Sequence, residues 1–192
     1  TTSALYIQNR IGAVNAWGID LANRCCTTVS TMKIAKDMLL ADETINTIMI
    51  VGGYRNGDLV DYSDKNMSMM FNLGAGGGAI ILQKNLNRNL LLGSHIIADG
   101  SLARTAGVEI GGTVNRIDES NINEAYGSLR LLDPKKMKDR LNEVSVKNWY
   151  SCIDKALEKS SLTRDNIDYL AILHMKRSGH EGMVRDLGLN EE

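Results

Sequence analysis

The residue with the clearest chemical potential is a cysteine at the predicted start of a helix. Cys25 lies in Gly18 to Thr28 (GIDLANRCCTT), after a strand-like approach and before a long apolar-periodic stretch. Backbone N–H groups at a helix N-terminus stabilise a thiolate, and they can hold the oxyanion that forms when a thioester carbonyl is attacked. Cys25 is therefore a candidate acyl acceptor. The alternative is structural, because cysteine often packs as a small buried hydrophobe.

A histidine at the end of a predicted strand is the second candidate. His174 follows the apolar run Ile167 to Leu173 (IDYLAIL), and open α/β proteins bind ligands at the carboxyl ends of their strands. The alternative is a histidine whose side chain is satisfied by a backbone carbonyl. Lys176 and Arg177 come directly afterwards and, with Arg185, could attract a phosphate or an acidic carrier surface. The alternative for these cations is a solvated helix face.

The glycine run Gly74 to Gly78 (GAGGG) has only a superficial likeness to a phosphate-binding loop. It lacks the lysine and the serine or threonine of a P-loop, and it precedes a predicted strand where a dinucleotide fingerprint would open a helix. Close approach of the backbone to a catalytic cleft or to a neighbouring strand explains these glycines better.

Hydrophobic periodicity predicts the elements that must position these residues. The run Ile45 to Val51 (INTIMIV) indicates a strand buried on both faces, and the region from Glu109 to Met137 indicates a variable surface insertion or lid with only short regular pieces. Strands alternating with helices favour an α/β fold with a buried mixed or parallel sheet. Helices are expected over Cys26 to Leu40, Val144 to Ser160 and Gly179 to Leu187, and further strands over Phe71 to Leu82, Leu90 to Ala98 and Ile167 to Leu173.

The composition excludes several classes of protein. The 192 residues are 43% hydrophobic with a formal net charge of −1, which is typical of a globular protein and offers no basic patch for nucleic acid. No apolar run reaches the roughly 20 residues of a membrane-spanning helix, and the N-terminus lacks the order of a secretory signal, so a cytoplasmic location is expected. The three cysteines predict free thiols, and their spacing from the histidines predicts no metal site.

The order of several short segments resembles the ketoacyl synthase III (3-oxoacyl-acyl carrier protein synthase III) condensing enzymes of the thiolase-like superfamily. In that family an aspartate five residues before the nucleophilic cysteine opens the active-site helix, which matches Asp20 and Cys25. The histidine of the family's His-Gln-Ala-Asn motif falls on His174. The matching segments are Ile7 to Gly12 (IQNRIG), Asp20 to Cys25, the Ile48 to Gly52 strand, Phe71 to Leu82, Ala98 to Ser101 (ADGS) and Ile167 to His174.

The resemblance implies a thiolase-like fold of two duplicated α/β halves, layered α-β-α-β-α and expected here to be incomplete at both ends. Residues 1–87 would be the remainder of the N-terminal half with the nucleophile, and residues 88–192 the start of the C-terminal half. Cys25 would carry an acyl group, and His174 would stabilise the carbonyl and the enolate, while an asparagine expected beyond Glu192 would be the third catalytic residue. From their positive charge, and not from the resemblance, Lys176 and Arg177 are expected to bind substrate.

The resemblance also implies the partners. Acyl-CoA or an acyl carrier protein would supply the acyl group, and a malonyl-thioester would be condensed with it in fatty acid or polyketide-type biosynthesis. No further cofactor and no metal are expected, and the enzyme would be a homodimer without nucleic-acid or membrane partners.

Three departures from the family pattern keep other functions open. Cys26, Thr27 and Thr28 replace a small residue, a glycine and an aromatic, which should alter the acyl pocket. The Gln-Ala-Asn after the histidine becomes Met-Lys-Arg at 175–177, and Leu73 replaces the aspartate of the glycine-rich motif. The alternatives are an acyltransferase that uses the same acyl-cysteine without decarboxylation and a catalytically silent partner subunit.

Overall fold

The computed structural model describes residues 2–127, 129–173 and 177–189, which form two compact units. The first unit comprises Thr1–Asn89 and Gly100–Met137, and it contains Cys25. The second comprises Leu90–Asp99 and Lys138–Glu192, and it contains Arg177. The duplicated halves expected at 1–87 and 88–192 stay a prediction.

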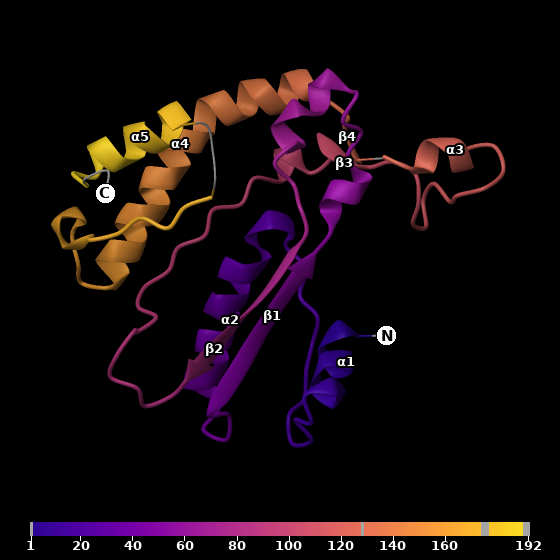
Figure 1. The fold of residues 1–192 in the computed structure, drawn as a ribbon. Coiled ribbons are helices and arrows are strands. Elements are labelled where there is room, and N and C mark those ends of the chain that lie inside the picture. Colours follow the sequence, from indigo (N-terminus) through magenta and orange to yellow (C-terminus); the bar gives the residue numbers. More distant parts are fainter. Residues whose placement is uncertain (1, 128, 174–176, 190–192) are drawn as a thin grey trace. The chain divides into compact units, whose positions relative to one another are not determined.

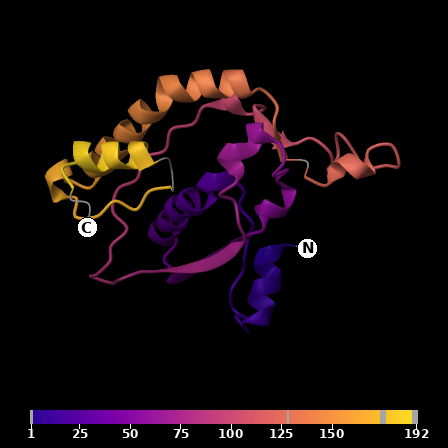
Figure 2. The ribbon, with the colours of Figure 1, turned by 45° about the horizontal axis from the view of Figure 1, so that its top comes forward.

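The first unit is built on helix α2 and a two-stranded antiparallel sheet (Figures 1 and 2). Helix α2 spans Thr27–Ala41, which confirms the helix predicted over Cys26 to Leu40. Strand β1 spans Thr47–Tyr54 and pairs with β2, Gly76–Gln83, over its whole length. Both strands were predicted, β1 from its β-branched apolar run and β2 from the apolar residues that follow the glycine run. A short helix, α1 (Ser3–Arg10), precedes α2.

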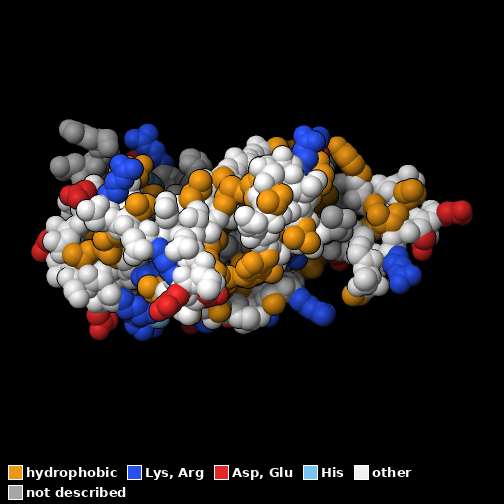
Figure 3. Space-filling view, turned by 90° about the horizontal axis from the view of Figure 1, so that it is seen from below, with side chains coloured by type: hydrophobic (Ala, Val, Ile, Leu, Met, Phe, Trp, Pro, Cys, Tyr) orange, Lys and Arg blue, Asp and Glu red, His pale blue; other side chains and the backbone are white. Residues whose placement is uncertain are grey.

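One face of this sheet is covered and the other is not. Ile50 of β1 is buried, as are Ala35 and Leu39 of α2, which packs on this sheet. Because side chains alternate along a strand, Met49 and Val51 point to the opposite face, where they are 40% and 43% exposed. The prediction that β1 is buried on both faces is therefore wrong. Apolar side chains reach the surface elsewhere too, as the orange groups in Figure 3 show.

The rest of the first unit is made of short elements, as predicted for the region from Glu109 to Met137. Its core includes Met67, which is fully buried, together with Val60 and Ile110. Val60 forms an isolated parallel bridge with Leu129. The short elements are β3 (Ala106–Val108) paired antiparallel with β4 (Leu129–Leu131), α3 (Ile122–Ala125), and 3-10 helices at Asn56–Leu59, Lys65–Met70 and Gly100–Leu102.

The segment at 90–99, predicted as a strand over Leu90 to Ala98, is instead an extended chain held by side chains of helix α4, Pro134–Lys159. Ser160, just after the helix, accepts a hydrogen bond from the Gly93 N–H on its Oγ at 2.8 Å. Lys159 Nζ donates to the Ser94 carbonyl at 2.9 Å, and Arg140 Nε donates to Asp99 at 2.7 Å. The strand prediction is wrong because the Gly93 N–H and the Ser94 carbonyl bond the side chains of Ser160 and Lys159, where a strand would pair them with a neighbouring strand.

The second predicted strand of this unit, Ile167 to Leu173, is also absent: these residues carry no strand assignment. They follow a 3-10 helix, Arg164–Asn166, and precede helix α5, Arg177–Asp186, which confirms the helix predicted near the C-terminus. Gly188 has φ +71°, a conformation that suits the residue after a helix end. Tyr150 of α4 donates to Asp186 at 2.7 Å and so connects α4 to α5.

The ladders among the described strands are antiparallel, so these strands do not form the mixed or parallel sheet that the alternation of elements favoured. The segments expected to supply further strands, 90–98 and 167–173, have no regular secondary structure and pair with no strand in the described ranges. In the same ranges, no helix combines the length and apolarity needed to cross a bilayer.

Candidate active site

Cys25 lies in a tight turn that leads into α2. The turn is a 3-10 helix, Arg24–Cys26, and Arg24 adopts φ +49°, which is uncommon for a residue with a side chain. The Cys26 N–H donates to the Asn23 carbonyl at 3.1 Å. Thr27 Oγ1 accepts from the Asn23 N–H and donates to the Arg24 carbonyl, both at 2.7 Å. This hydrogen-bonded turn fixes the backbone on both sides of Cys25.

The turn presents Cys25 to solvent, which contradicts the interpretation of this cysteine as a buried hydrophobe. The thiol lies two residues before α2, a helix of 15 residues whose first turn contains no acidic side chain. The positive end of the helix dipole is therefore not offset by a carboxylate in that turn, which favours an anion at this place. An exposed thiol in such surroundings can act as a nucleophile toward a thioester.

A patch of backbone without side chains lies beside the first turn of α2. Gly52 pairs with Gly78, and Gly53 pairs with Gly77, across β1 and β2. A Cβ built on Gly52 would lie 3.9 Å from Thr28 Oγ1, so this patch approaches the same helix end that carries Cys25. The expectation that the glycine run serves close backbone approach to a neighbouring strand is confirmed.

Sequence reasoning missed the part that Thr27 plays in this site. The departure at 26–28 was interpreted only as a change in the acyl pocket, yet the Thr27 hydroxyl makes the hydrogen bonds that close the turn. The available signal was the pair Asn23 and Thr27, polar residues four apart at a helix start, where such side chains satisfy free backbone groups.

The family resemblance implied that Asp20 opens α2, but it does not. Its carboxylate accepts hydrogen bonds from the N–H groups of Ser3 and Ala4, each at 2.8 Å, and so caps the first turn of α1. These backbone hydrogen bonds, with Ala4 the larger contribution, hold the pKa of Asp20 below its ordinary value of 3.8. Asp20 thus ties α1 to the chain that leads to Cys25.

We expect Asp20→Asn to lower the thermal unfolding temperature at pH 7, because the ionised carboxylate is a stronger acceptor than an amide. Since the folded pKa lies below the unfolded one, the carboxylate's contribution is complete above the unfolded pKa and is lost as the pH falls through the folded pKa. The difference from wild type should therefore shrink as the pH falls below about 4.

Unfolding temperatures measured from pH 7 down to pH 3 would check this, with Asp168→Asn as a control at an exposed aspartate outside the capping contact. A difference that stayed constant, or grew, toward acid pH would contradict the capping role.

The other predicted site residues lie in the C-terminal part of the chain. His174 and Lys176 fall outside the described residues. Arg177 is the first residue of α5, its side chain is 89% exposed, and its Nε binds Glu181 Oε1 at 2.5 Å. It belongs to a different compact unit from Cys25. The roles given to these three residues stay predictions.

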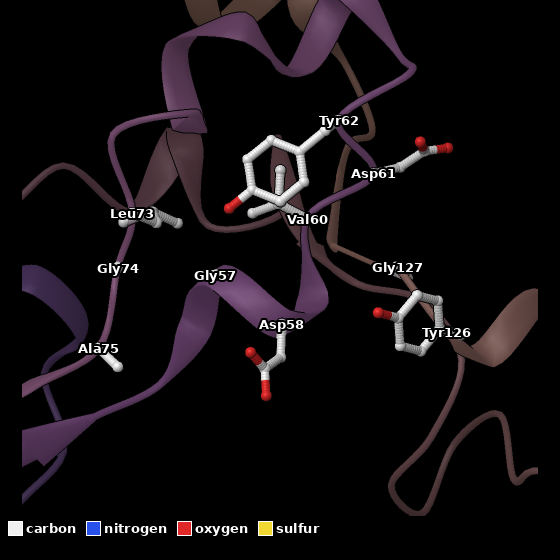
Figure 4. A pocket seen from close by; sticks show the side chains of 10 residues that line it. All are labelled: Gly57, Asp58, Val60, Asp61, Tyr62, Leu73, Gly74, Ala75, Tyr126 and Gly127. Atoms are coloured by element: carbon white, nitrogen blue, oxygen red, sulfur yellow. The ribbon is translucent and has the colours of Figure 1, made fainter.

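A cavity of about 570 Å³ lies in the first unit, near the start of β2 (Figure 4). Its wall includes Asp58 and Asp61, but Asp58 pairs with Arg55 at 2.6 Å, and Asp61 accepts from the Ser63 hydroxyl at 2.6 Å. Cys25 is not among its lining residues, which are Gly57, Asp58, Val60, Asp61, Tyr62, Leu73, Gly74, Ala75, Tyr126 and Gly127. Since the carboxylates of Asp58 and Asp61 already have partners, we assign the cavity no chemistry.

No group of three or more His, Cys, Asp or Glu in the described part of the chain is placed to hold a metal ion.

Cys25 lies in the part of the chain that matches a known family model. Residues 19–100 match the family model described as 3-oxoacyl-[acyl-carrier-protein (ACP)] synthase III. A β-ketoacyl-[acyl-carrier-protein] synthase III of Azobacteroides pseudotrichonymphae is 27% identical over 168 residues, covering 88% of this chain and 48% of that protein. The Thermosynechococcus vestitus enzyme of the same name is 28% identical over 191 residues, covering 99% of this chain and 56% of the relative. The chain thus spans about half the length of these relatives.

Two solved structures share the fold. The 3-oxoacyl-[acyl-carrier-protein] synthase III of Aquifex aeolicus superposes with a TM-score of 0.76 at 16% identity, covering all of this chain and 55% of that one. The priming β-ketosynthase from the R1128 polyketide biosynthetic pathway gives a TM-score of 0.72 at 20% identity, covering 97% of this chain and 52% of that one. The predicted α/β thiolase-like fold and the divergent, partial resemblance to the synthase III enzymes are confirmed.

Proposed function

We propose that this chain carries the acyl-accepting part of a condensing enzyme similar to 3-oxoacyl-[acyl-carrier-protein] synthase III, with Cys25 as the nucleophile. The observation that supports this most is the exposed thiol on a hydrogen-bonded turn at the start of α2, within the residues that match the family model. Exposure makes the thiol accessible to a thioester, and the turn fixes its backbone. The reaction class is acyl transfer followed by carbon–carbon bond formation.

The first step is transfer of an acyl group from acyl-CoA to Cys25. The Cys25 thiolate attacks the thioester carbonyl, and backbone N–H groups at the helix start hold the oxyanion. The carbon–sulfur bond to CoA then breaks, and CoA leaves as a thiol after taking a proton. The paired glycines beside Thr28 expose bare backbone next to this helix end, which leaves room for the thioester's acyl chain.

The second step forms the new carbon–carbon bond. A malonyl-thioester loses carbon dioxide, the resulting enolate attacks the acyl carbonyl on Cys25, and the thiolate leaves to regenerate the enzyme. By its resemblance to the family histidine, His174 stabilises the enolate. The relatives' names specify an acyl carrier protein, which we propose as the carrier of the malonyl group. Lys176 and Arg177 would attract the phosphates of CoA or an acidic carrier surface. We also propose a homodimer.

Acyl transfer without decarboxylation is the second candidate. It is favoured by Arg177, which stands where the synthase III enzymes carry an asparagine and is already bound to Glu181. A guanidinium has no hydrogen-bond acceptor, whereas an asparagine side chain has an oxygen that accepts. The acyl group on Cys25 would then pass to a nucleophile other than an enolate.

Incubation with acetyl-CoA followed by intact-mass measurement and peptide mapping tests the first step. We expect one acetyl adduct, on the peptide that contains Cys25, and its absence would overturn the proposal and favour a silent partner subunit. Release of carbon dioxide from malonyl-thioester by the acylated protein tests the second step. Loss of that release in His174→Ala with the adduct intact supports condensation, whereas an adduct without any release supports simple transfer.

A further inference from the structure

Cys26 is a second thiol beside the proposed nucleophile, and the acyl-transfer chemistry does not use it. Both cysteines are exposed and free, and they are adjacent in the chain. The peptide bond between them is trans. Cys26 is also the N-cap residue of α2, but its side chain makes no capping hydrogen bond. The Cys26 thiol is therefore accessible and is not needed to begin the helix.

We propose that Cys25 and Cys26 form a peroxide-responsive dithiol, in which Cys26 captures the oxidised form of Cys25 as a reversible disulfide. This goes beyond the proposed acyl transfer and requires only the two thiols. While the disulfide exists, Cys25 carries no free thiolate, so any chemistry that depends on Cys25 stops.

The surroundings of Cys25 favour oxidation at this residue. Cysteines that react with peroxide are solvent-accessible and lie in electropositive surroundings. The thiol is exposed, and it precedes a helix whose first turn has no acid to offset the positive end of the dipole. The resolving thiol is the next residue in the chain. The hydrogen bonds of Asn23, Arg24 and Thr27 hold the backbone around both thiols.

The chemistry balances with hydrogen peroxide as the oxidant. The Cys25 thiolate attacks one peroxide oxygen, the O–O bond breaks, and the products are a sulfenic acid and hydroxide. The Cys26 sulfur then attacks the sulfenic sulfur and displaces hydroxide, and the thiol proton completes a water molecule. Two thiols lose two electrons in total, and one peroxide becomes two waters.

The disulfide would be easily reduced, as a reversible modification requires. Consecutive Cα atoms across a trans peptide are about 3.8 Å apart, whereas most disulfides join Cα atoms roughly 4.4–6.8 Å apart. The small ring is therefore strained, and strained, exposed disulfides are the labile ones. Cys152, on α4 in the other compact unit, has no cysteine beside it in the sequence and serves as an internal comparison.

A peroxide titration followed by intact-mass measurement and peptide mapping tests this inference. In the wild-type protein the peptide with both cysteines should lose about 2 Da, and dithiothreitol should restore it. In Cys26→Ser the same peptide should instead gain about 32 Da as sulfinic acid, irreversibly, and at least about tenfold faster than in wild type. Cys152→Ser should behave as wild type does.

Two results would overturn the inference: equal rates of irreversible oxidation in wild type and Cys26→Ser, or a disulfide that joins Cys25 to Cys152 or to a second copy of the chain. A Cys26→Ala variant repeats the comparison without a hydroxyl at this position. Because the readout is the mass of the oxidised peptide, the dithiol can be confirmed even if no acyl adduct forms, and the acyl adduct can form even if the dithiol fails.

Discussion

Cys25→Ser should abolish the acyl adduct, with the rate of acylation by acetyl-CoA falling by at least about 10³-fold. Serine keeps the size and position of the side chain, but its hydroxyl has no nearby base in the turn and remains a weak nucleophile. The substituted residue is exposed, so the free energy of unfolding should change by no more than about 0.5 kcal/mol. Stopped incubations analysed by intact mass, with thermal unfolding of the same samples, measure both quantities.

The other two cysteines are the matched controls for this substitution. Cys26→Ser and Cys152→Ser should each keep a single adduct on the Cys25 peptide. If Cys25→Ser still formed an adduct that mapped to Cys26, the nucleophile would have been assigned to the wrong neighbour. An adduct that mapped to Cys152 would remove the start of α2 from the mechanism.

Gly93→Ala should be the most destabilising small substitution in the second unit. A Cβ at this position would lie 2.4 Å from the Ala156 carbonyl oxygen, 2.7 Å from Ser160 Oγ and 2.8 Å from Lys159 Cβ. The backbone of α4 must therefore shift, or the segment must detach and lose the bond from the Gly93 N–H to Ser160. Overpacking of this kind costs roughly 3 kcal/mol. For a chain of this size the unfolding temperature would then fall by on the order of 6–12 °C.

Gly182→Ala gives a control in the same unit. This glycine lies within α5, and the nearest atom to an added Cβ is a flexible arginine nitrogen at 3.8 Å, so alanine should raise stability by about 0.5–1 kcal/mol. The double variant Gly93→Ala with Ser160→Ala should recover only part of the loss, because the Ala156 carbonyl remains in place. Full recovery, or an unchanged unfolding temperature for Gly93→Ala alone, would show that the segment does not contact α4 as described.

Local periodicity was enough to predict the helix at α2 and the strands β1 and β2, because each is specified by its own apolar pattern. It failed at 90–98 and 167–173, where apolar runs of similar composition form no strand. A run of β-branched residues becomes a strand only when a neighbouring strand accepts its backbone hydrogen bonds. At Gly93 and Ser94 those bonds go to Ser160 and Lys159, some 65 residues away, which no local pattern records.

The candidate site could be predicted only in part, for the same reason. Cys25 was identified from its place before a helix, and the structure adds its exposure and the closed turn around it. Asp20 was misplaced because its partners, Ser3 and Ala4, lie 16–17 residues earlier in the chain. The contribution of Thr27 depends on backbone angles at Arg24 that a residue with a side chain seldom adopts. His174 and Lys176 remain predictions from resemblance.

The bonds between the segment at 93–99 and α4 have a mechanical consequence. Arg140 and Lys159 lie about 29 Å apart along α4 at the rise of a regular helix, and their long side chains bond Asp99 and Ser94 of the segment. The segment is therefore hydrogen-bonded to residues near both ends of this stretch of α4. Bending α4 away from the segment must stretch one of these hydrogen bonds. The resistance of α4 to bending is therefore a property of the helix and the segment together.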